Sequence, residues 1–408
     1  MKPQSDILIV GGGLNGPALA LALAQGGFSV TIIDALPVAR LEGRDFDGRA
    51  YALALASKQM LTALGIWADI ADHSQPILDI IASDGRAGEG AAPWFLHFDH
   101  LEIEEGPMGF MLEDRYLRRA LLTAVADNSA ITQINERRVV AQETDTLGAQ
   151  VTLDDGQILR GQLLIGCDGR DSGTATRAGI SRMGWGYDQT ALVCAIAHDL
   201  PHNGIAHQFF MPSGPLGILP LPGNRCSIVW AETTERADWI KSLPDADFLA
   251  ELRPCFGDFL GEISLEGGRF AYPLKLTVAN QFTGQRLALV GDAAHGMHPL
   301  AGQGLNMGLR DVASLAEVLT LAKRRGEDFT TSLVLDRYQQ WRGFDTVSMS
   351  MATDGINKLF SNDNTLVRAG RDLGLGLVNA LPGLRRGLIR QAAGLSGDLP
   401  KLMQGRVI

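Results

Sequence analysis

The chain begins with glycines whose spacing suits phosphate binding, in the G-x-G-x-x-G motif of Gly11, Gly13 and Gly16. An apolar run at 7–10 precedes them, a small-residue run at 18–24 follows, and Asp34 ends a second apolar run. This order predicts strand, turn, helix and strand, with the helix N-terminus open to a pyrophosphate and Asp34 beside a ribose. Because Asp34 would repel a 2′-phosphate, we expect FAD or NAD rather than NADP; the alternative is a glycine-rich turn without a ligand.

Two later segments also end an apolar run in a carboxylate that stands next to a glycine. Asp168 and Gly169 follow the run at 163–166, and Asp292 follows the run at 286–290. Both segments are expected at the carboxyl edge of a parallel sheet, where ligands bind in α/β folds. Asp292 could bind polyol hydroxyls, and the glycines after it could stabilise negative charge on an electron-rich ring. A simple turn is the alternative reading of Asp168.

Several arginines could meet a phosphate. Arg49 follows the second strand, and a helix predicted over 113–127 carries three more near its start, namely Arg115, Arg118 and Arg119. Solvated side chains are the alternative for all of them. Glu232 and Glu235 are the nearest thing to an acid pair, and they read as solvated beside Arg236. His295 and His298 lack metal-ligand partners at helical spacing, so no metal site is predicted.

Composition narrows the class of protein. The 408 residues are 46% hydrophobic and 20% charged, with a net charge of −10, which argues against nucleic acid as a partner. Four scattered cysteines fit a reducing compartment. No apolar run reaches the roughly 18 residues that span a bilayer. We therefore expect a cytoplasmic protein.

Between 183 and 270 short alternating runs and turn pairs predict a mainly antiparallel sheet, with one face packed and the other walling a pocket. The aromatic candidates for that wall, each of which could instead be ordinary core, are Trp185, Tyr187, His207, Phe209, Phe210 and Trp230. Asp154-Asp155-Gly156 predicts a hairpin turn. A helix is predicted over 306–321.

Three motifs in order, GGGLNG, CDGRDS and LVGDAAHGMHPLAGQGLNMGLRD, resemble the single-component FAD-dependent aromatic hydroxylases over roughly residues 5–345. The run RAYALALAS and the segment WRGFDTVSMSMATDGINKLFSND resemble the ubiquinone-biosynthesis branch of that class, which hydroxylates polyprenylated phenols. The resemblance implies an α/β fold: a Rossmann-like FAD-binding domain with an inserted, mainly antiparallel β substrate domain and a C-terminal helical region. The implied division is 1–180, 181–270, 271–345 and 346–408, with the strand segments at 75–112 belonging either to the first part or to the substrate domain.

The resemblance also implies site residues. For the FAD, Gly11, Gly13 and Gly16 are implied at the pyrophosphate, Asp34 at the ribose, and Arg49 and Arg118 near the phosphates. Asp168 and Gly169 are implied to face both FAD and NAD(P)H, and Asp292 to bind the ribityl chain. The backbone of Gly302, Gly304, Leu305 and Asn306 is implied to lie against the isoalloxazine ring. His298 and Pro299 beside the ring are the implied catalytic residues. Many relatives carry an arginine where this chain has Ala175, with Arg177 two residues further on, which leaves the electron donor open between NAD(P)H and another reductant.

The implied reaction is hydroxylation of the ring of a polyprenylated phenol in ubiquinone biosynthesis, with O₂ and a flavin C4a-hydroperoxide. The alternatives are a flavin-binding scaffold of a quinone-biosynthesis complex, or a hydroxylase of another aromatic substrate. Other quinone-biosynthesis proteins are candidate partners. The segment 361–408 holds seven Lys and Arg against three acids, among leucines. It is expected either to touch the inner face of a membrane or to pack as a helix on the body.

Overall fold

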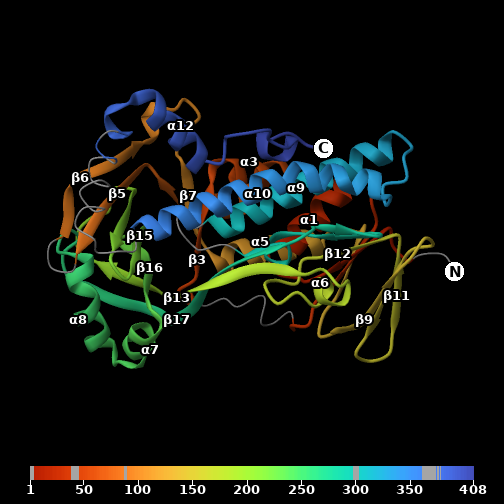
Figure 1. Cartoon of the computed structure of the whole chain (residues 1–408), viewed down its shortest axis with the longest axis horizontal. Coiled ribbons are helices and arrows are strands. Elements are labelled where there is room, and N and C mark those ends of the chain that lie inside the picture. The colour runs from red at the N-terminus through yellow and green to blue at the C-terminus, as the bar shows by residue number, and fades with distance from the viewer. Residues whose placement is uncertain are drawn as a thin grey trace.

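The computed structural model of the protein describes residues 4–37, 46–86, 90–296, 303–360, 374, 376 and 378–408. Its strands form four sheets in these ranges. Figure 1 shows the two larger sheets side by side, with the long strands β13 (Arg182–His198) and β17 (Ile263–Ala279) running between the two halves. The long helix α10 (Ser332–Phe360) spans both halves on the opposite side.

A six-stranded sheet of order β18-β19-β12-β1-β2-β8 forms the first half. It is parallel except at its edge strand β18. Its strands are β1 (Ile7–Val10), β2 (Val30–Ile33), β8 (Ile131–Ile134), β12 (Leu163–Gly166), β18 (Thr283–Gly284) and β19 (Leu287–Leu289). The central strands are continuous apolar runs because helices or a second sheet cover both of their faces.

An eight-stranded sheet of order β20-β17-β13-β16-β15-β14-β5-β6 forms the second half. All its pairings are antiparallel except that between β14 and β5. Its further strands are β5 (Asp79–Arg86), β6 (Gly90–Asp99), β14 (Ile205–Met211), β15 (Gly214–Leu221), β16 (Arg225–Thr233) and β20 (His295–Gly296). The strands β5 and β6 thus join the sheet formed mainly by residues 182–279.

Two three-stranded sheets complete the strands. One links the halves through β3 (Ala50–Ala54), β7 (Gly109–Glu113) and β4 (Ser74–Ile77). The other lies at the end of the molecule remote from α7 and α8 (Figure 1), and consists of β9 (Val139–Thr144), β10 (Ala149–Leu153) and β11 (Ile158–Gly161). The antiparallel pairing of β10 with β11 around Gly156, whose φ is 85°, confirms the predicted hairpin.

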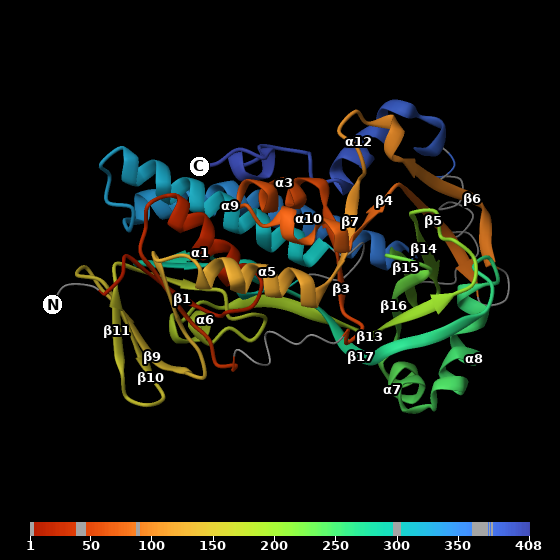
Figure 2. The same cartoon turned by 180° about the vertical axis from the view of Figure 1, so that it is seen from behind.

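The other helices are α1 (Asn15–Gln25), α3 (Leu55–Ala63), α4 (Trp67–Ile70), α5 (Asp114–Ala126), α6 (Gly173–Arg177), α7 (Thr234–Ser242), α8 (Asp245–Phe256), α9 (Gln303–Arg324) and α12 (Pro382–Ala392). Figure 2 shows α1 and α5 alongside each other, with α9 and α10 stacked behind them. Small side chains in α1 allow this close packing, and most of that helix is buried. The largest apolar core lies here, between the helices and the parallel sheet.

The predicted fold class is confirmed: an α/β fold with a Rossmann-like parallel sheet, a largely antiparallel second sheet, and helices toward the C-terminus. The helix predicted over 306–321 is α9, which begins three residues earlier at Gln303. The division at 180, 270 and 345 stays a prediction. At the second boundary β17 runs without interruption from Ile263 to Ala279.

Candidate functional site

Three turns meet at the carboxyl edge of the parallel sheet, because β12 pairs with β1 on one side and β19 on the other. Gly11 approaches the strand end at Cys167 so closely that a Cβ there would lie 2.3 Å from the Cys167 carbonyl oxygen. A Cβ on Gly16 would lie 2.0 Å from the carbonyl oxygen of Gly11. Glycine at both positions is therefore a steric requirement of the turn.

Gly13 differs from these two glycines. A Cβ built on it meets no described heavy atom within 4 Å, and the residue lines a large cavity. Asp34 accepts hydrogen bonds from the backbone N–H groups of Gly12 and Leu36, which fixes its carboxylate beside the same turn. The space at Gly13 and the position of Asp34 fit the pyrophosphate and ribose of a dinucleotide.

Asn15, at the start of α1 after the first glycine turn, packs against the turn at Gly291 and against Gly308 of α9. A Cβ on Gly291 would lie 2.2 Å from its Nδ2, and one on Gly308 would lie 2.4 Å from the same atom. Its Oδ1 is buried and has no hydrogen-bond partner among the described residues, although the residue lines the cavity. A buried amide oxygen without a donor is costly, so this atom also fits a site built around a polar ligand.

Asp114 is a buried carboxylate that holds two arginines at the cavity wall. Arg118 donates to both its oxygens at 3.0 and 2.8 Å, Arg49 lies 3.6 Å away, and the Tyr51 hydroxyl donates at 2.9 Å. Burial alone would raise the pKa of Asp114, but the hydrogen bonds and charge of Arg118, and the charge of Arg49, lower it. Burial, then the charge of Asp114, raises the pKa of Tyr51. The group therefore fixes the guanidinium groups of Arg49 and Arg118 at the cavity wall, and Arg49 is also held by Asp47 at 2.6 Å.

The two predicted strand-end carboxylates have different surroundings. Asp168 accepts hydrogen bonds from the Ser172 hydroxyl and from the N–H and hydroxyl of Thr174, so its carboxylate caps α6. Asp292 lines the cavity and accepts from Nε of Arg170 at 3.2 Å. Asp292 therefore faces the cavity and Asp168 the first turn of α6, and the cofactor roles of both stay predictions.

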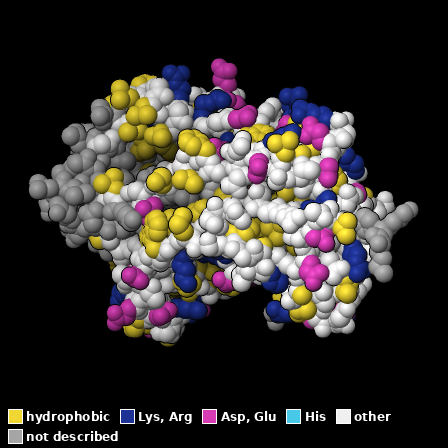
Figure 3. Space-filling view, turned by 45° about the vertical axis from the view of Figure 1, so that its right-hand side comes forward, with side chains coloured by type: hydrophobic (Ala, Val, Ile, Leu, Met, Phe, Trp, Pro, Cys, Tyr) yellow, Lys and Arg dark blue, Asp and Glu magenta, His cyan; other side chains and the backbone are white. Residues whose placement is uncertain are grey.

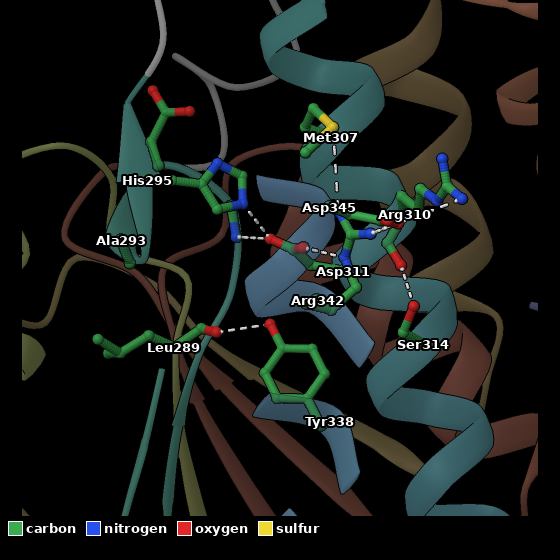
Figure 4. A network of polar contacts seen from close by, with 12 residues as sticks. Leu289, Ala293, His295, Met307, Arg310, Asp311, Ser314, Tyr338, Arg342 and Asp345 are labelled. Atoms are coloured by element: carbon green, nitrogen blue, oxygen red, sulfur yellow. Dashed lines mark hydrogen bonds and ion pairs between the residues drawn. The ribbon is translucent and has the colours of Figure 1, made fainter. Parts of the chain in front are cut away.

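A buried polar network joins the segment from Leu289 to His295 with α9 and α10 (Figure 4). Asp311 of α9 accepts from Nε2 of His295 at 2.6 Å, from the N–H of Gly291 at 2.9 Å, and from Nε of Arg342 at 2.7 Å. Arg342 of α10 is fully buried and also donates to Asp345 at 2.8 Å. Burial alone would raise the pKa of Asp311, but the charges of His295 and Arg342 lower it. The network therefore fixes the backbone of the turn that carries Asp292.

Sequence reasoning missed this network. The signal was present for Asp311, which stands in a helix whose neighbouring positions are mostly apolar and buried. A charge in an apolar stripe needs a partner, but the sequence does not say which one.

Asn306 was predicted to lie against the isoalloxazine ring. Its side chain instead ties α9 to β3 and α3: Oδ1 accepts from Ala54 N–H and from the Ser57 hydroxyl at 2.8 Å, and Nδ2 donates to Ala52 carbonyl oxygen at 2.8 Å. The ring-facing role of its backbone stays a prediction. Gly304 and Leu305 line the cavity. His298, Pro299 and Gly302 lie outside the described residues.

A cavity of about 630 Å³ runs from these turns to the second sheet. Its turn side includes Gly13, Arg49, Arg118, Gly169, Asp292 and Gly304. Its sheet side consists of Ala191, Val193, Gln208, Pro215, Gly217, Leu219, Val229, Ala231, Tyr272 and Leu274. The cavity is therefore charged at one end and largely apolar at the other.

The prediction of an aromatic wall is wrong. None of the six predicted aromatic residues is among the described residues that line the cavity. Phe209 and Trp230 point to the opposite face of the sheet, where they pack with α7 and α8. Trp185 and Tyr187 donate hydrogen bonds to Asp354 of α10. Small and aliphatic residues line the wall because a cavity requires space, which large side chains would fill.

Comparison with known proteins matches this chain to a family. A family model described as "FAD binding domain" matches residues 4–343. Ubiquinone hydroxylase UbiL of Rhodospirillum rubrum is 45% identical over 404 residues, which cover 98% of this chain and 93% of that protein. The 3-demethoxyubiquinol 3-hydroxylase of Escherichia coli is 34% identical, over 96% of this chain and 99% of its own. The chain belongs to the ubiquinone-biosynthesis FAD-dependent hydroxylase family.

Solved structures agree on the fold of this hydroxylase. The crystal structure of p-nitrophenol 4-monooxygenase PnpA from Pseudomonas putida has a TM-score of 0.80 at 19% identity, covering 97% of this chain and 99% of that chain. That of PqsL from Pseudomonas aeruginosa has a TM-score of 0.71 at 21% identity, covering 90% and 98%. The protein is an FAD-dependent aromatic-ring hydroxylase. In the described residues no group of three or more His, Cys, Asp or Glu side chains could hold a metal ion.

Proposed function

We propose that this hydroxylase acts on the ring of a polyprenylated phenol in ubiquinone biosynthesis. The observation that carries the proposal is the cavity, which joins the FAD-fitting turns to a wall of small aliphatic side chains from β13, β15 and β16. A lipid-tailed phenol needs an apolar wall for its tail and a dry surface for its ring. Burial of each apolar CH₂ group of the tail favours binding by about 0.8 kcal/mol.

Different residues of the chain would then have different roles in this reaction. Gly13, Asp34 and Asp292 bind the cofactor through its phosphates and hydroxyls, and the Asp114 group offsets phosphate charge with Arg49 and Arg118. Bound FAD, once reduced, would supply activated oxygen as the C4a-hydroperoxide. The aliphatic wall excludes water from that oxygen, which favours its transfer to the ring over its loss as hydrogen peroxide.

The electron donor is NAD(P)H or another reductant. Arg177 does not take the place of the family arginine at residue 175, because it donates to the Gln142 side chain and to the carbonyl oxygen of Val139, away from the cavity. Arg170 is nearer to the cavity and pairs with Asp292. We propose Arg49 and Arg170 as the cations that a nicotinamide cofactor would meet.

The proposal is tested with FAD-loaded protein, an artificial reductant and a short-chain prenylated phenol under ¹⁸O₂. We expect one ¹⁸O atom in the product ring by mass spectrometry. Hydrogen peroxide as the sole oxygen product in the presence of every phenol tried would contradict hydroxylation.

A scaffold role gives a different result in cells. In a strain lacking the gene, Asp292→Ala should fail to restore quinone synthesis if the protein works through its flavin. Asp171→Ala, an exposed carboxylate of the neighbouring turn, is the matched control and should restore it. Full restoration by Asp292→Ala would favour the scaffold, which acts by contact with other quinone-biosynthesis proteins.

We also propose that α12 touches a membrane surface, from which a lipid substrate would enter. Leu381, Leu384 and Leu388 are exposed at helical spacing, and exposed Leu101 adds to them. Of the arginines on α12, Arg385 and Arg390 pair with Glu102 and Glu105, so the leucines rather than net charge would supply the affinity. Figure 3 shows hydrophobic side chains exposed on one face beside the undescribed atoms. In the described residues no helix has the length and apolar character to cross a bilayer.

A vesicle test checks this contact. Leu384→Asp should reduce co-sedimentation with phosphatidylglycerol-containing vesicles several-fold while FAD binding is unchanged. Equal sedimentation of the variant and the unmodified protein would exclude α12 as the contact.

A further inference from the structure

One polar side chain stands in the middle of the apolar wall. Gln208 on β14 is in register with Gly217 on β15, which is in register with Val229 on β16 and through it with Val193 on β13. All four line the cavity, so they form one row across the sheet on the same face. The three other members of the row are apolar, which makes the amide a local exception.

The amide of Gln208 has space in front of it. A Cβ built on Gly217 would lie 3.7 Å from Oε1 of Gln208, so the glycine leaves room beside the amide that a larger residue would fill. No hydrogen bond joins this side chain to any described residue. Neither of its polar atoms is sealed from the cavity. An amide in an apolar wall gains free energy only when something in the cavity hydrogen-bonds to it.

Tyr272 is the other polar side chain on the sheet side of the described cavity wall. It is 41% exposed, so water can satisfy its hydroxyl without a ligand. Gln208 on β14 lies four strands away from it, beyond β13, β16 and β15, among aliphatic neighbours. Of the two, Gln208 therefore depends more on a ligand for its hydrogen bonds.

We propose that Gln208 determines specificity by hydrogen-bonding the ring oxygen of the phenol while the row around it holds the ring and the prenyl tail. This inference rests on the proposed function. A primary amide both donates and accepts, so it can accept from a phenol O–H or donate to an ionised phenol oxygen. A prenylated arene without a ring oxygen would bury the amide unpaired and so bind less tightly.

The test compares two probes on FAD-loaded protein, a short-chain prenylated phenol and the same arene without its hydroxyl. Binding is followed by the change in flavin absorbance. The unmodified protein should bind the phenol roughly tenfold more tightly than the arene, as expected for one buried hydrogen bond. Gln208→Met, close in shape, should abolish that preference by weakening the phenol alone. If Gln208→Met does not take up FAD, Gln208→Leu is measured in its place, with the same expected loss of preference.

Gln189→Met is the matched control. Gln189 also belongs to the second sheet, but it donates to the carbonyl oxygen of Ser213 and does not line the cavity. Its loss should lower stability and leave the phenol preference intact. If Gln208→Met and Gln208→Leu keep the preference, or if Tyr272→Phe removes it instead, the inference is overturned. If the unmodified protein binds neither probe, the proposed function itself fails, which separates the two failures.

Discussion

Nε2 of His295 lies 2.6 Å from Oδ2 of Asp311, and the same carboxylate oxygen accepts the backbone N–H of Gly291 at 2.9 Å. The pair joins β20 to α9 behind the turn that carries Asp292. Both side chains are almost fully buried. The position of the turn that brings Asp292 to the cavity therefore depends on residues buried behind that turn.

Asp311→Asn should destabilise the apoprotein and weaken FAD binding together. Among the described residues, the change leaves Asp345 as the remaining carboxylate partner of the buried guanidinium of Arg342, and breaking a buried pair costs about 3–5 kcal/mol. Urea unfolding and a fluorescence titration with FAD measure the two effects. Glu251→Gln, which breaks the more exposed pair with Arg236, is the control and should cost at most about 1 kcal/mol. Equal effects of the two variants would contradict the structural role of Asp311.

Gly13→Ala and Gly16→Ala should separate cofactor binding from folding. A Cβ on Gly13 projects into open cavity, whereas one on Gly16 lies 2.0 Å from the Gly11 carbonyl oxygen. We expect Gly13→Ala to weaken FAD binding at least about tenfold with little change in apoprotein stability, and Gly16→Ala to lower that stability by roughly 1–3 kcal/mol. Apoprotein melting and FAD titration distinguish them, and a reversed pattern would contradict the phosphate site at Gly13.

His207 should make the protein less stable in mild acid. Burial against Phe209 and Phe259 lowers its pKa from 6.5 to about 4. The folded state thus favours the neutral ring. The contribution of His207 to the free energy of unfolding is therefore fully present above pH 6.5 and is lost as the pH falls toward 4. The loss is about 2 kcal/mol at pH 5 relative to pH 8. His207→Phe should remove this part of the pH dependence in urea unfolding; an unchanged slope between pH 7 and 5 would show that the ring is not buried neutral.

Val229→Phe should narrow the cavity without disturbing the cofactor. Val229 lines the sheet side of the cavity in the row of Gln208, whereas Gly13, Arg49 and Asp292 line its turn side. We expect FAD affinity to be unchanged and the KM for a prenylated phenol to rise roughly tenfold, because the larger ring excludes part of the ligand. Val229→Thr, of similar size, is the control. A variant that retains the original KM would place the substrate elsewhere.

The sequence was sufficient to predict features that depend on residues close together along the chain. Gly11, Gly13 and Asp34 could be placed at one turn because a strand, a turn, a helix and a second strand follow each other within about 30 residues. The aromatic wall could not, since which face of a strand meets the cavity depends on registers such as that of Gln208 with Gly217. The same holds for Asp311 and Arg342, whose partners are 16 and 31 residues away along the chain. Contacts of this kind are set by packing, not by spacing.

The most direct test of the account is the electron density of FAD in crystals of the loaded protein. We predict the pyrophosphate at Gly13, the ribityl chain beside Asp292, and the isoalloxazine ring facing the cavity wall that holds Val193 and Val229. A flavin bound with its ring outside this cavity, or with its phosphates away from the first glycine turn, would contradict the account.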